Sequence, residues 1–183
     1  MRIITGSARG KKLVTLEGEQ VRPTSERVKE SLFNIVQFDL EGRRVLDLFA
    51  GSGQLGLEAV SRGAKQAILV DCAKESVEVI RKNTAHCGFS DRVQIVQMDF
   101  AAYLASNPQK FDVAFLDPPY LHGLLQKALP LVVQAMNPGG TILCEHPTDE
   151  QLPDEVGGFC AGKRYRYGKI SLTMYRRKEV VEV

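Results

Sequence analysis

From residue 44 onward, short and nearly all-apolar runs alternate with segments of helical spacing. The runs have strand length and lie at residues 45–49, 67–71, 92–97, 111–116 and 141–145, the third alternating rather than continuous. A strand that is apolar at almost every position is buried on both faces, and such strands joined by helices form parallel sheets. The sequence therefore predicts an α/β protein with a mostly parallel sheet covered on both sides.

The connecting segments have the spacing and the stop signals of helices. Helices are expected over residues 55–62, 73–87, 100–105 and 122–136, the last one kinked or split at Pro130. Residues 137–140, Asn-Pro-Gly-Gly, are expected to form a loop. These helices are long enough to cover both faces of the sheet.

Both ends of the chain depart from this alternation. The runs 163–167 and 169–176 flank Gly168 and predict a hairpin added antiparallel at the sheet edge. At the other end, residues 2–5 and 11–16 resemble short strands, and residues 24–37 resemble an amphipathic helix. We therefore expect a small N-terminal extension before the sheet.

Several classes of protein are disfavoured by what the chain lacks. Its four cysteines and three histidines have no metal-ligand spacing, so we expect reduced thiols and no metal site. No apolar run has the length of a membrane span, and the N-terminus has no signal-peptide core. A cytoplasmic protein without a membrane partner is the expectation.

Charge is distributed unevenly along the chain. Residues 1–44 carry nine Lys/Arg and six Asp/Glu, residues 160–183 carry seven and two, and the stretch between them carries eight and fourteen. Basic ends on an acidic body are typical of a protein that approaches a polyanion. Two solvated basic faces would explain the same pattern, so charge alone leaves both readings open.

A glycine-rich turn follows the first apolar run. Gly51, Gly53 and Gly56 fit the pattern G-x-G-x-x-G, and Asp71 ends the next run, twenty positions after Gly51. In a doubly wound sheet both features lie at the carboxyl edge, where the glycines admit a ligand and the carboxylate accepts from ribose hydroxyls. The pattern fits a dinucleotide and S-adenosylmethionine equally well.

Two further carboxylates favour S-adenosylmethionine. Asp47 ends the first run, where it suits a cationic sulfonium and ammonium ligand and would repel a pyrophosphate. Asp99 and Phe100 follow the third run and offer a carboxylate and a ring to an adenine. Asp99 also has the position of a helix N-cap, and the two roles are compatible.

The fourth run ends in Asp117-Pro118-Pro119-Tyr120. The prolines lack N–H groups and fix φ, so the strand stops here on a stiff segment. The Asp117 carboxylate and the Pro118 carbonyl can accept both protons of an exocyclic amine, and Tyr120 can stack on a flipped base. The segment thus predicts methyl transfer to the amine of a nucleobase.

These motifs resemble those of class I, Rossmann-like S-adenosylmethionine-dependent amino-methyltransferases. More narrowly, the chain is similar to the bacterial 16S ribosomal RNA guanine-N2 methyltransferases of the RsmD family. The similar stretches are the opening Met-Arg-Ile-Ile-Thr-Gly, residues 22–34, 45–53 and 115–120, and the closing Lys-Arg-Tyr and Tyr-Gly-Lys-Ile-Ser-Leu run. They extend over nearly the whole chain.

The resemblance implies a single methyltransferase domain over residues 1–183, with an N-terminal extension at 1–43 and a catalytic core at 44–183. Its sheet would have seven strands, mostly parallel, with a C-terminal antiparallel hairpin, and the extension would be a small β-hairpin and a helix. The implied reaction is direct in-line methylation of the exocyclic N2 of guanine 966 in 16S ribosomal RNA, on a flipped base. S-adenosylmethionine would become S-adenosylhomocysteine, and a monomer would act on free RNA or a partly assembled small subunit.

The resemblance also implies two groups of site residues, and the basic ends of the chain supply a third group that could touch phosphates of the RNA. The catalytic group that holds the guanine is Asp117, Pro118, Pro119 and Tyr120. The cofactor-binding group is Arg22, Thr24, Asp47, Phe49, Ala50, Gly51, Ser52, Gly53, Asp71, Asp99 and Phe100. The RNA-binding group is Arg2, Arg9, Lys11, Lys12, Lys163, Arg164 and Arg166.

Two other functions remain as alternatives. A DNA adenine-N6 or cytosine-N4 methyltransferase would share the Asp-Pro-Pro-Tyr segment, but the chain has no stretch large enough for a separate target-recognition domain. A non-catalytic module that binds a nucleotide such as NAD would not need all four site elements. Cys144 is disfavoured as a nucleophile because no Pro-Cys motif surrounds it.

Overall fold

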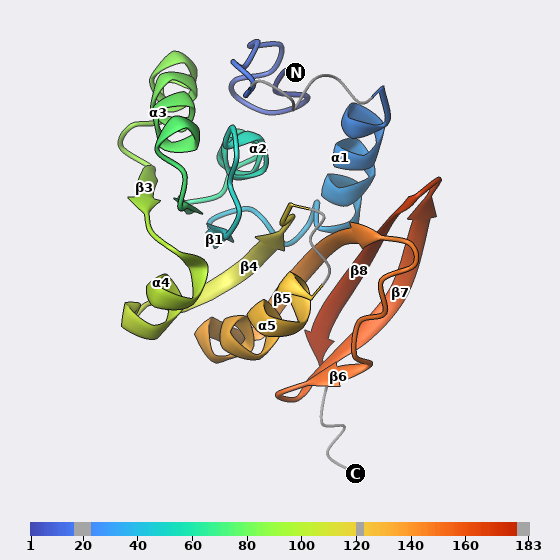
Figure 1. Ribbon diagram of the computed structural model, residues 1–183. Coiled ribbons are helices and arrows are strands. Elements are labelled where there is room, and N and C mark those ends of the chain that lie inside the picture. Colours follow the sequence, from blue (N-terminus) through green and yellow to red (C-terminus); the bar gives the residue numbers. More distant parts are fainter. Residues whose placement is uncertain (17–22, 120–122, 179–183) are drawn as a thin grey trace.

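The computed structural model describes residues 1–16, 23–119 and 123–178, except for the side chains of residues 23–25. In these residues, eight strands form one sheet in the order β3-β2-β1-β4-β5-β8-β7-β6 (Figure 1). The strands are β1 (Arg44–Asp47), β2 (Gln66–Asp71), β3 (Val93–Gln97), β4 (Phe111–Leu116), β5 (Met136–Pro147), β6 (Glu155–Val156), β7 (Phe159–Tyr167) and β8 (Ile170–Arg177).

Helices cover both faces of this sheet, as expected for strands that are buried on both sides. They are α1 (Pro23–Ile35), α2 (Gln54–Ser61), α3 (Lys74–Cys87), α4 (Phe100–Ser106), α5 (Leu124–Val132) and the 3-10 turn η1 (Val133–Ala135). Side chains of α1, α2 and α3 pack in one core cluster, and those of α4, α5 and η1 pack in the other. Successive strand residues alternate between the clusters, so Phe115 faces α1 whereas Leu116 faces α5.

The strand order places two loops at a point where ligands commonly bind. Strands β1 to β5 are parallel, and β1 lies between β2 and β4. The chain therefore runs outward from β1 through β2 to β3, then returns to the other side of β1 to form β4. Ligands of open α/β sheets bind at such a reversal, outside the carboxyl ends of the strands. The glycine-rich turn follows β1 and the two prolines follow β4, so both lie there.

The predicted antiparallel hairpin is present, with some differences in detail. β7 and β8 pair antiparallel, and β8 joins β5. The two-residue β6 pairs with β7 and gives the sheet one strand more than the seven expected. β5 begins at Met136, before the expected loop at residues 137–140. Phe111 of β4 pairs with Met136, and after a register shift the pairing resumes between Val113 and Thr141.

The N-terminal extension is less regular than expected. Its predicted hairpin contains one antiparallel bridge, between Arg2 and Lys12, and Ile3 N–H and Leu13 N–H donate across it to the carbonyls of Lys11 and Met1. Polar contacts to α2 also hold the segment: the Ile4 and Thr5 N–H groups donate to Glu58, and Ala8 N–H donates to Ser61 Oγ. The segment thus lies against the helix that follows the glycine-rich turn.

A glycine is required where this segment comes nearest to α2. Gly6 has φ of 89°, and a Cβ placed there would lie 1.8 Å from the backbone oxygen of Ser61. Any side chain would have to displace the extension from α2.

No helix of the described residues is long and apolar enough to cross a membrane.

Candidate active site

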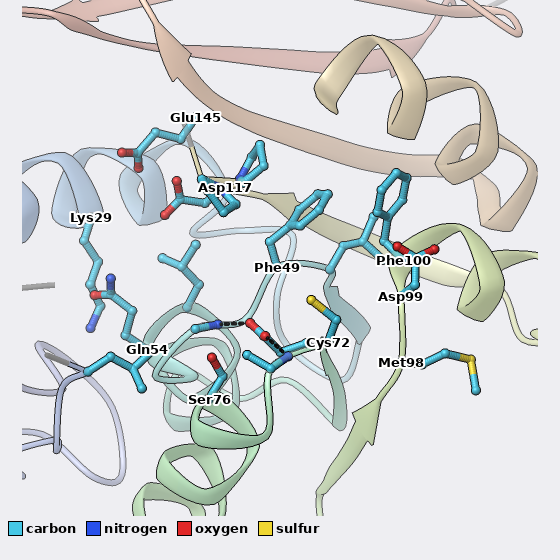
Figure 2. A pocket seen from close by; sticks show the side chains of 18 of the residues that line it. Lys29, Phe49, Gln54, Cys72, Ser76, Met98, Asp99, Phe100, Asp117 and Glu145 are labelled. Atoms are coloured by element: carbon cyan, nitrogen blue, oxygen red, sulfur yellow. Dashed lines mark hydrogen bonds between the residues drawn. The ribbon is translucent and has the colours of Figure 1, made fainter. Parts of the chain in front are cut away.

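A pocket of about 590 Å³ lies at the carboxyl ends of the parallel strands (Figure 2). Each of the five parallel strands contributes lining residues from its end or from the loop that follows it. Met1 and Leu16 of the extension and Lys29 of α1 line it as well. The volume is in the usual range for pockets that bind small molecules.

The glycine-rich turn divides into residues that line the pocket and residues that support it. Phe49 and Gly51 line the pocket, whereas Ala50, Ser52 and Gly53 are buried and are not among the lining residues. Gly53 begins α2 with φ of 81°, in the left-handed region that favours glycine. Of the five turn residues predicted to bind the cofactor, the structure brings two into direct contact with the pocket.

Asp47 was expected beside the methionine part of the ligand, but it is not among the residues that line the pocket. Its side chain is buried, and its Oδ2 accepts from the backbone N–H of Gly56 at 2.9 Å. A Cβ on Gly56 would lie 2.5 Å from Leu69 Cδ1, so α2 packs closely on β2. Asp47 therefore stabilises the first turn of α2 through this buried hydrogen bond.

Asp71 connects the ends of β1 and β2. Its Oδ2 accepts from Gly51 N–H and its Oδ1 accepts from Ala73 N–H, both at 2.9 Å, as the dashed lines in Figure 2 show. A carboxylate has about four acceptor positions, so two protein donors leave room for ligand hydroxyls. Asp71 lines the pocket and can therefore hold both the turn and a bound diol.

An aromatic pair lies at one end of the pocket. The ring centroids of Phe49 and Phe100 are 5.3 Å apart at an interplanar angle of 48°. Next to them, Asp99 Oδ1 accepts from the N–H groups of Ala101 and Ala102, so Asp99 is the N-cap of α4. Asp99, Phe100 and Met98 line the pocket. This end offers ring faces and a carboxylate to a flat, polar-edged group.

The opposite end holds two carboxylates. Asp117, Pro118 and Pro119 line the pocket after β4, and Glu145 of β5 lines it beside them. Figure 2 draws Asp117 and Glu145 near each other, away from Asp99 and Phe100. Tyr120 and Arg22 lie outside the described residues, as does the side chain of Thr24. The partners predicted for these three positions therefore stay predictions.

Lys29, Gln54 and Glu145 are pocket residues that the sequence motifs did not indicate. Lys29 is 3% exposed, and its Nζ lies 3.0 Å from Glu58 Oε2. Burial alone would raise the pKa of Glu58, but Lys29, the Ile4 N–H and Arg62 together lower it, so the carboxylate stays ionised. Gln54 lies within the glycine-rich pattern, and Glu145 ends the fifth apolar run, so both had a local signal that was not used. Lys29 had no such signal, because it reaches the pocket only through the packing of α1.

Other predicted groups lie away from the pocket. Cys144 is fully buried, and burial raises the pKa of its thiol, which agrees with its exclusion as a nucleophile. Within the described ranges, no group of three or more His, Cys, Asp or Glu residues could hold a metal ion.

The predicted RNA-binding residues form two separate groups. Arg2, Arg9, Lys11 and Lys12 belong to the extension beside α2 and α3, whereas Lys163, Arg164 and Arg166 lie on β7 near the far edge of the sheet. In Figure 1, α1 lies between the two regions. Lys11 Nζ donates to the His86 carbonyl, so this lysine also anchors the extension to α3.

The fold and the pocket together define a class I, Rossmann-like methyltransferase that uses S-adenosylmethionine. The pocket fits that cofactor in size, in the acceptor capacity of Asp71 and in the aromatic pair at one end. The family described as "Conserved hypothetical protein 95" matches residues 1–176. The chain belongs to this family.

Two solved structures and one curated relative agree with this assignment. "Ribosomal RNA small subunit methyltransferase D" of Escherichia coli K12 is 31% identical over 97% of this chain and 90% of its own length. A structure described as "Putative methyltransferase yhhF from Escherichia coli" has a TM-score of 0.85, 30% identity and coverage of 97% and 98%. An RNA methyltransferase from Salinibacter ruber, solved with S-adenosyl-L-homocysteine, shares the fold at a TM-score of 0.65, 17% identity and coverage of 86% and 95%.

Proposed function

We propose that this protein transfers a methyl group from S-adenosylmethionine to the exocyclic N2 of a guanine in small-subunit ribosomal RNA. The observation that carries the proposal is that Asp71 and the Asp117-Pro118-Pro119 segment line one continuous pocket. A relative that matches nearly the whole chain is named as a ribosomal RNA small subunit methyltransferase, which supports the RNA as substrate. The resemblance to the RsmD family further suggests guanine 966 as the target.

The cofactor would lie along the ends of β3, β2 and β1. Asp99 and the ring of Phe100 would contact the adenine, and Asp71 would accept from the ribose hydroxyls. Gly51 permits a close approach of the methionine part, and Lys29 offers a cation near Gln54 at that end of the pocket. Asp47 would act indirectly, by fixing the turn through Gly56.

When bound, S-adenosylmethionine supplies a methyl group activated by the positive charge of its sulfonium. The protein must then orient an amine whose lone pair is delocalised into the base. The Asp117 carboxylate and the Pro118 carbonyl would accept the two amine protons, which turns the lone pair toward the pocket. Pro118 and Pro119 make this segment stiff, so little freedom is lost in reaching the transition state. The methyl–sulfur bond would break as the methyl–nitrogen bond forms, leaving a neutral thioether, and the cationic methylated amine would then lose one proton to water.

A base that is stacked in the RNA must leave its stack to bring its exocyclic amine into the pocket. We propose that Tyr120 stacks on the flipped base and that the two basic groups contact phosphates on either side of α1. Phosphate contacts of this kind add affinity and salt sensitivity without selecting a sequence.

Labelled methyl transfer tests the proposal. Purified protein is incubated with methyl-labelled cofactor and with 16S ribosomal RNA, small-subunit particles lacking the modification, or duplex DNA, and the digested nucleosides are identified by mass spectrometry. We expect N2-methylguanosine at one position of the RNA. Label in adenine or cytosine, or transfer to duplex DNA alone, would instead support the DNA amino-methyltransferase reading.

A further inference from the structure

We propose that Glu145 selects guanine by accepting a hydrogen bond from its N1–H while the neighbouring amine is methylated. This inference rests on the proposed function, because it concerns the base whose amine reacts. Glu145 lines the same pocket as Asp117, and neither the sequence motifs nor the relatives assign it a role. It is a specificity-determining residue rather than part of the methyl-transfer machinery.

The sheet register places Glu145 next to Asp117. β4 and β5 are parallel, and Leu116 pairs with Cys144, so the residues that follow them are neighbours at adjacent strand ends. Leu116 and Cys144 both face α5, and side chains alternate along strands. Asp117 and Glu145 therefore both project toward the face covered by α1, as Figure 2 shows for the two labelled side chains.

Strand order separates the cofactor side of the pocket from the base side. Moving across the sheet, the lining residues are Asp99 after β3, Asp71 at β2, Gly51 after β1, Asp117 after β4 and Glu145 on β5. The first three would hold adenine, ribose and methionine, and Asp117 would hold the amine. Glu145 lies one strand beyond the amine and away from the cofactor, where the ring of the target base would lie.

The chemistry of the bases then decides what a carboxylate at this place would accept. In guanine, the ring nitrogen N1 beside the exocyclic amine carries a proton and donates. In adenine and cytosine, the ring nitrogen beside the amine is an unprotonated acceptor, which a carboxylate repels. A carboxylate next to the amine-holding residue thus favours guanine and opposes both amino-methylation substrates of the alternative DNA reading.

The test replaces the target guanine by 2-aminopurine, which keeps the 2-amino group but has no N1–H. The modified position is first located with wild-type protein, and ligated RNA then carries either base at that position. Wild type should methylate guanine at least about tenfold better, since a hydrogen bond to a charged group contributes to that extent. In Glu145→Gln, whose amide can also donate to N1, the guanine to 2-aminopurine ratio should fall by about tenfold.

Two controls isolate the base contact. Glu155→Gln alters an exposed glutamate on β6 and should leave the ratio unchanged. Calorimetric binding of S-adenosylhomocysteine to Glu145→Gln should stay within about twofold of wild type, because Glu145 lies beyond β4 from the cofactor residues. Comparing the guanine to 2-aminopurine rate ratio of Glu145→Gln with that of wild type cancels any intrinsic difference in reactivity between the two 2-amino groups.

The outcomes distinguish this inference from the proposed function. If wild type methylates no guanine of the RNA, the proposed function fails. If wild type methylates guanine and 2-aminopurine equally well, Glu145 does not read N1–H, and this result requires no variant to fold. If Glu145→Gln loses both activities in the same proportion, the selector role is likewise wrong.

Discussion

The Nζ atom of Lys29 lies 3.0 Å from the Oε2 atom of Glu58, and the two side chains are 2% and 0% exposed. Lys29 belongs to α1 and also donates to the carbonyl of Arg2, whereas Glu58 belongs to α2 and accepts from the extension. One buried ion pair thus joins three separate segments beside the pocket. Arg62 Nε donates to the same carboxylate at 2.8 Å and completes its set of donors.

Glu58→Gln should destabilise the protein by about 3–5 kcal/mol, because it leaves the buried Lys29 cation without its counter-charge. The free energy of unfolding in urea at neutral pH measures this. Glu78→Gln breaks an exposed pair with Lys74 at 4.0 Å and should cost less than about 1 kcal/mol. Adding Lys29→Met to Glu58→Gln should recover part of the loss. Equal effects of the two glutamine variants would contradict a stabilising role for the pair.

Asp71→Asn should weaken the binding of S-adenosylhomocysteine by about 10- to 100-fold. The amide nitrogen cannot accept from Gly51 or Ala73, so the variant has one backbone hydrogen bond fewer and one acceptor fewer for the ribose. Titration calorimetry gives the affinity, and Asp91→Asn, an exposed aspartate before β3, is the matched control. An affinity within about twofold of wild type would remove Asp71 from the ribose site.

Asp117→Ala should lower the rate of methyl transfer by about 100-fold or more, because the amine is no longer aligned. Cofactor affinity should change by less than about twofold, since Asp117 lines the pocket away from Asp99 and Phe100. Single-turnover transfer and calorimetry separate the two effects, with the exposed Asp149→Ala as control. Near-normal turnover with bound cofactor would show that Asp117 does not orient the amine.

The two basic groups should contribute separately to RNA binding. Removing the exposed Lys163 and Arg164 should lower the slope of log affinity against log salt by about 0.7–0.9 for each phosphate that the variant no longer neutralises. Removing Arg9 and Lys12 should do the same if the extension also contacts RNA. Lys65→Ala, exposed at the amino end of β2, should leave the slope unchanged. A group whose removal leaves the slope unchanged lies outside the interface.

The sequence predicted those elements whose burial is periodic. β4 is found where the apolar run predicted it, α2 differs from its expected bounds by one residue at each end, and α3 differs by one residue at its start. The start of β5 was missed because Pro138, Gly139 and Gly140 indicate a loop, whereas a register shift admits them to the strand. The N-terminal segments pair antiparallel as predicted, but through a single bridge between Arg2 and Lys12, and contacts to Glu58 and Ser61 also hold the pair against α2.

The site was predictable where a motif is contiguous. Asp71, Asp99 and Asp117 were found because each follows a strand that the pattern identifies, and all three line the pocket. Glu145 was missed although it ends the fifth apolar run, because no motif surrounds it, whereas Lys29 was missed because only tertiary packing brings α1 to the pocket. Asp47 was singled out by its position at a strand end; its side chain is buried and accepts from Gly56 N–H, and its contact with the cofactor stays a prediction.

Cys72 has a practical consequence. Its thiol is exposed and lines the pocket directly after Asp71, whereas Cys87 and Cys144 are buried and Cys160 is half-buried on β7. A maleimide dye should therefore attach to the unaltered chain chiefly at Cys72, in the wall of the pocket. Because a bound ligand would shield Cys72, the rate of labelling offers an optical readout of whether the pocket is occupied. The same sulfur can serve as the attachment point in covalent fragment screening.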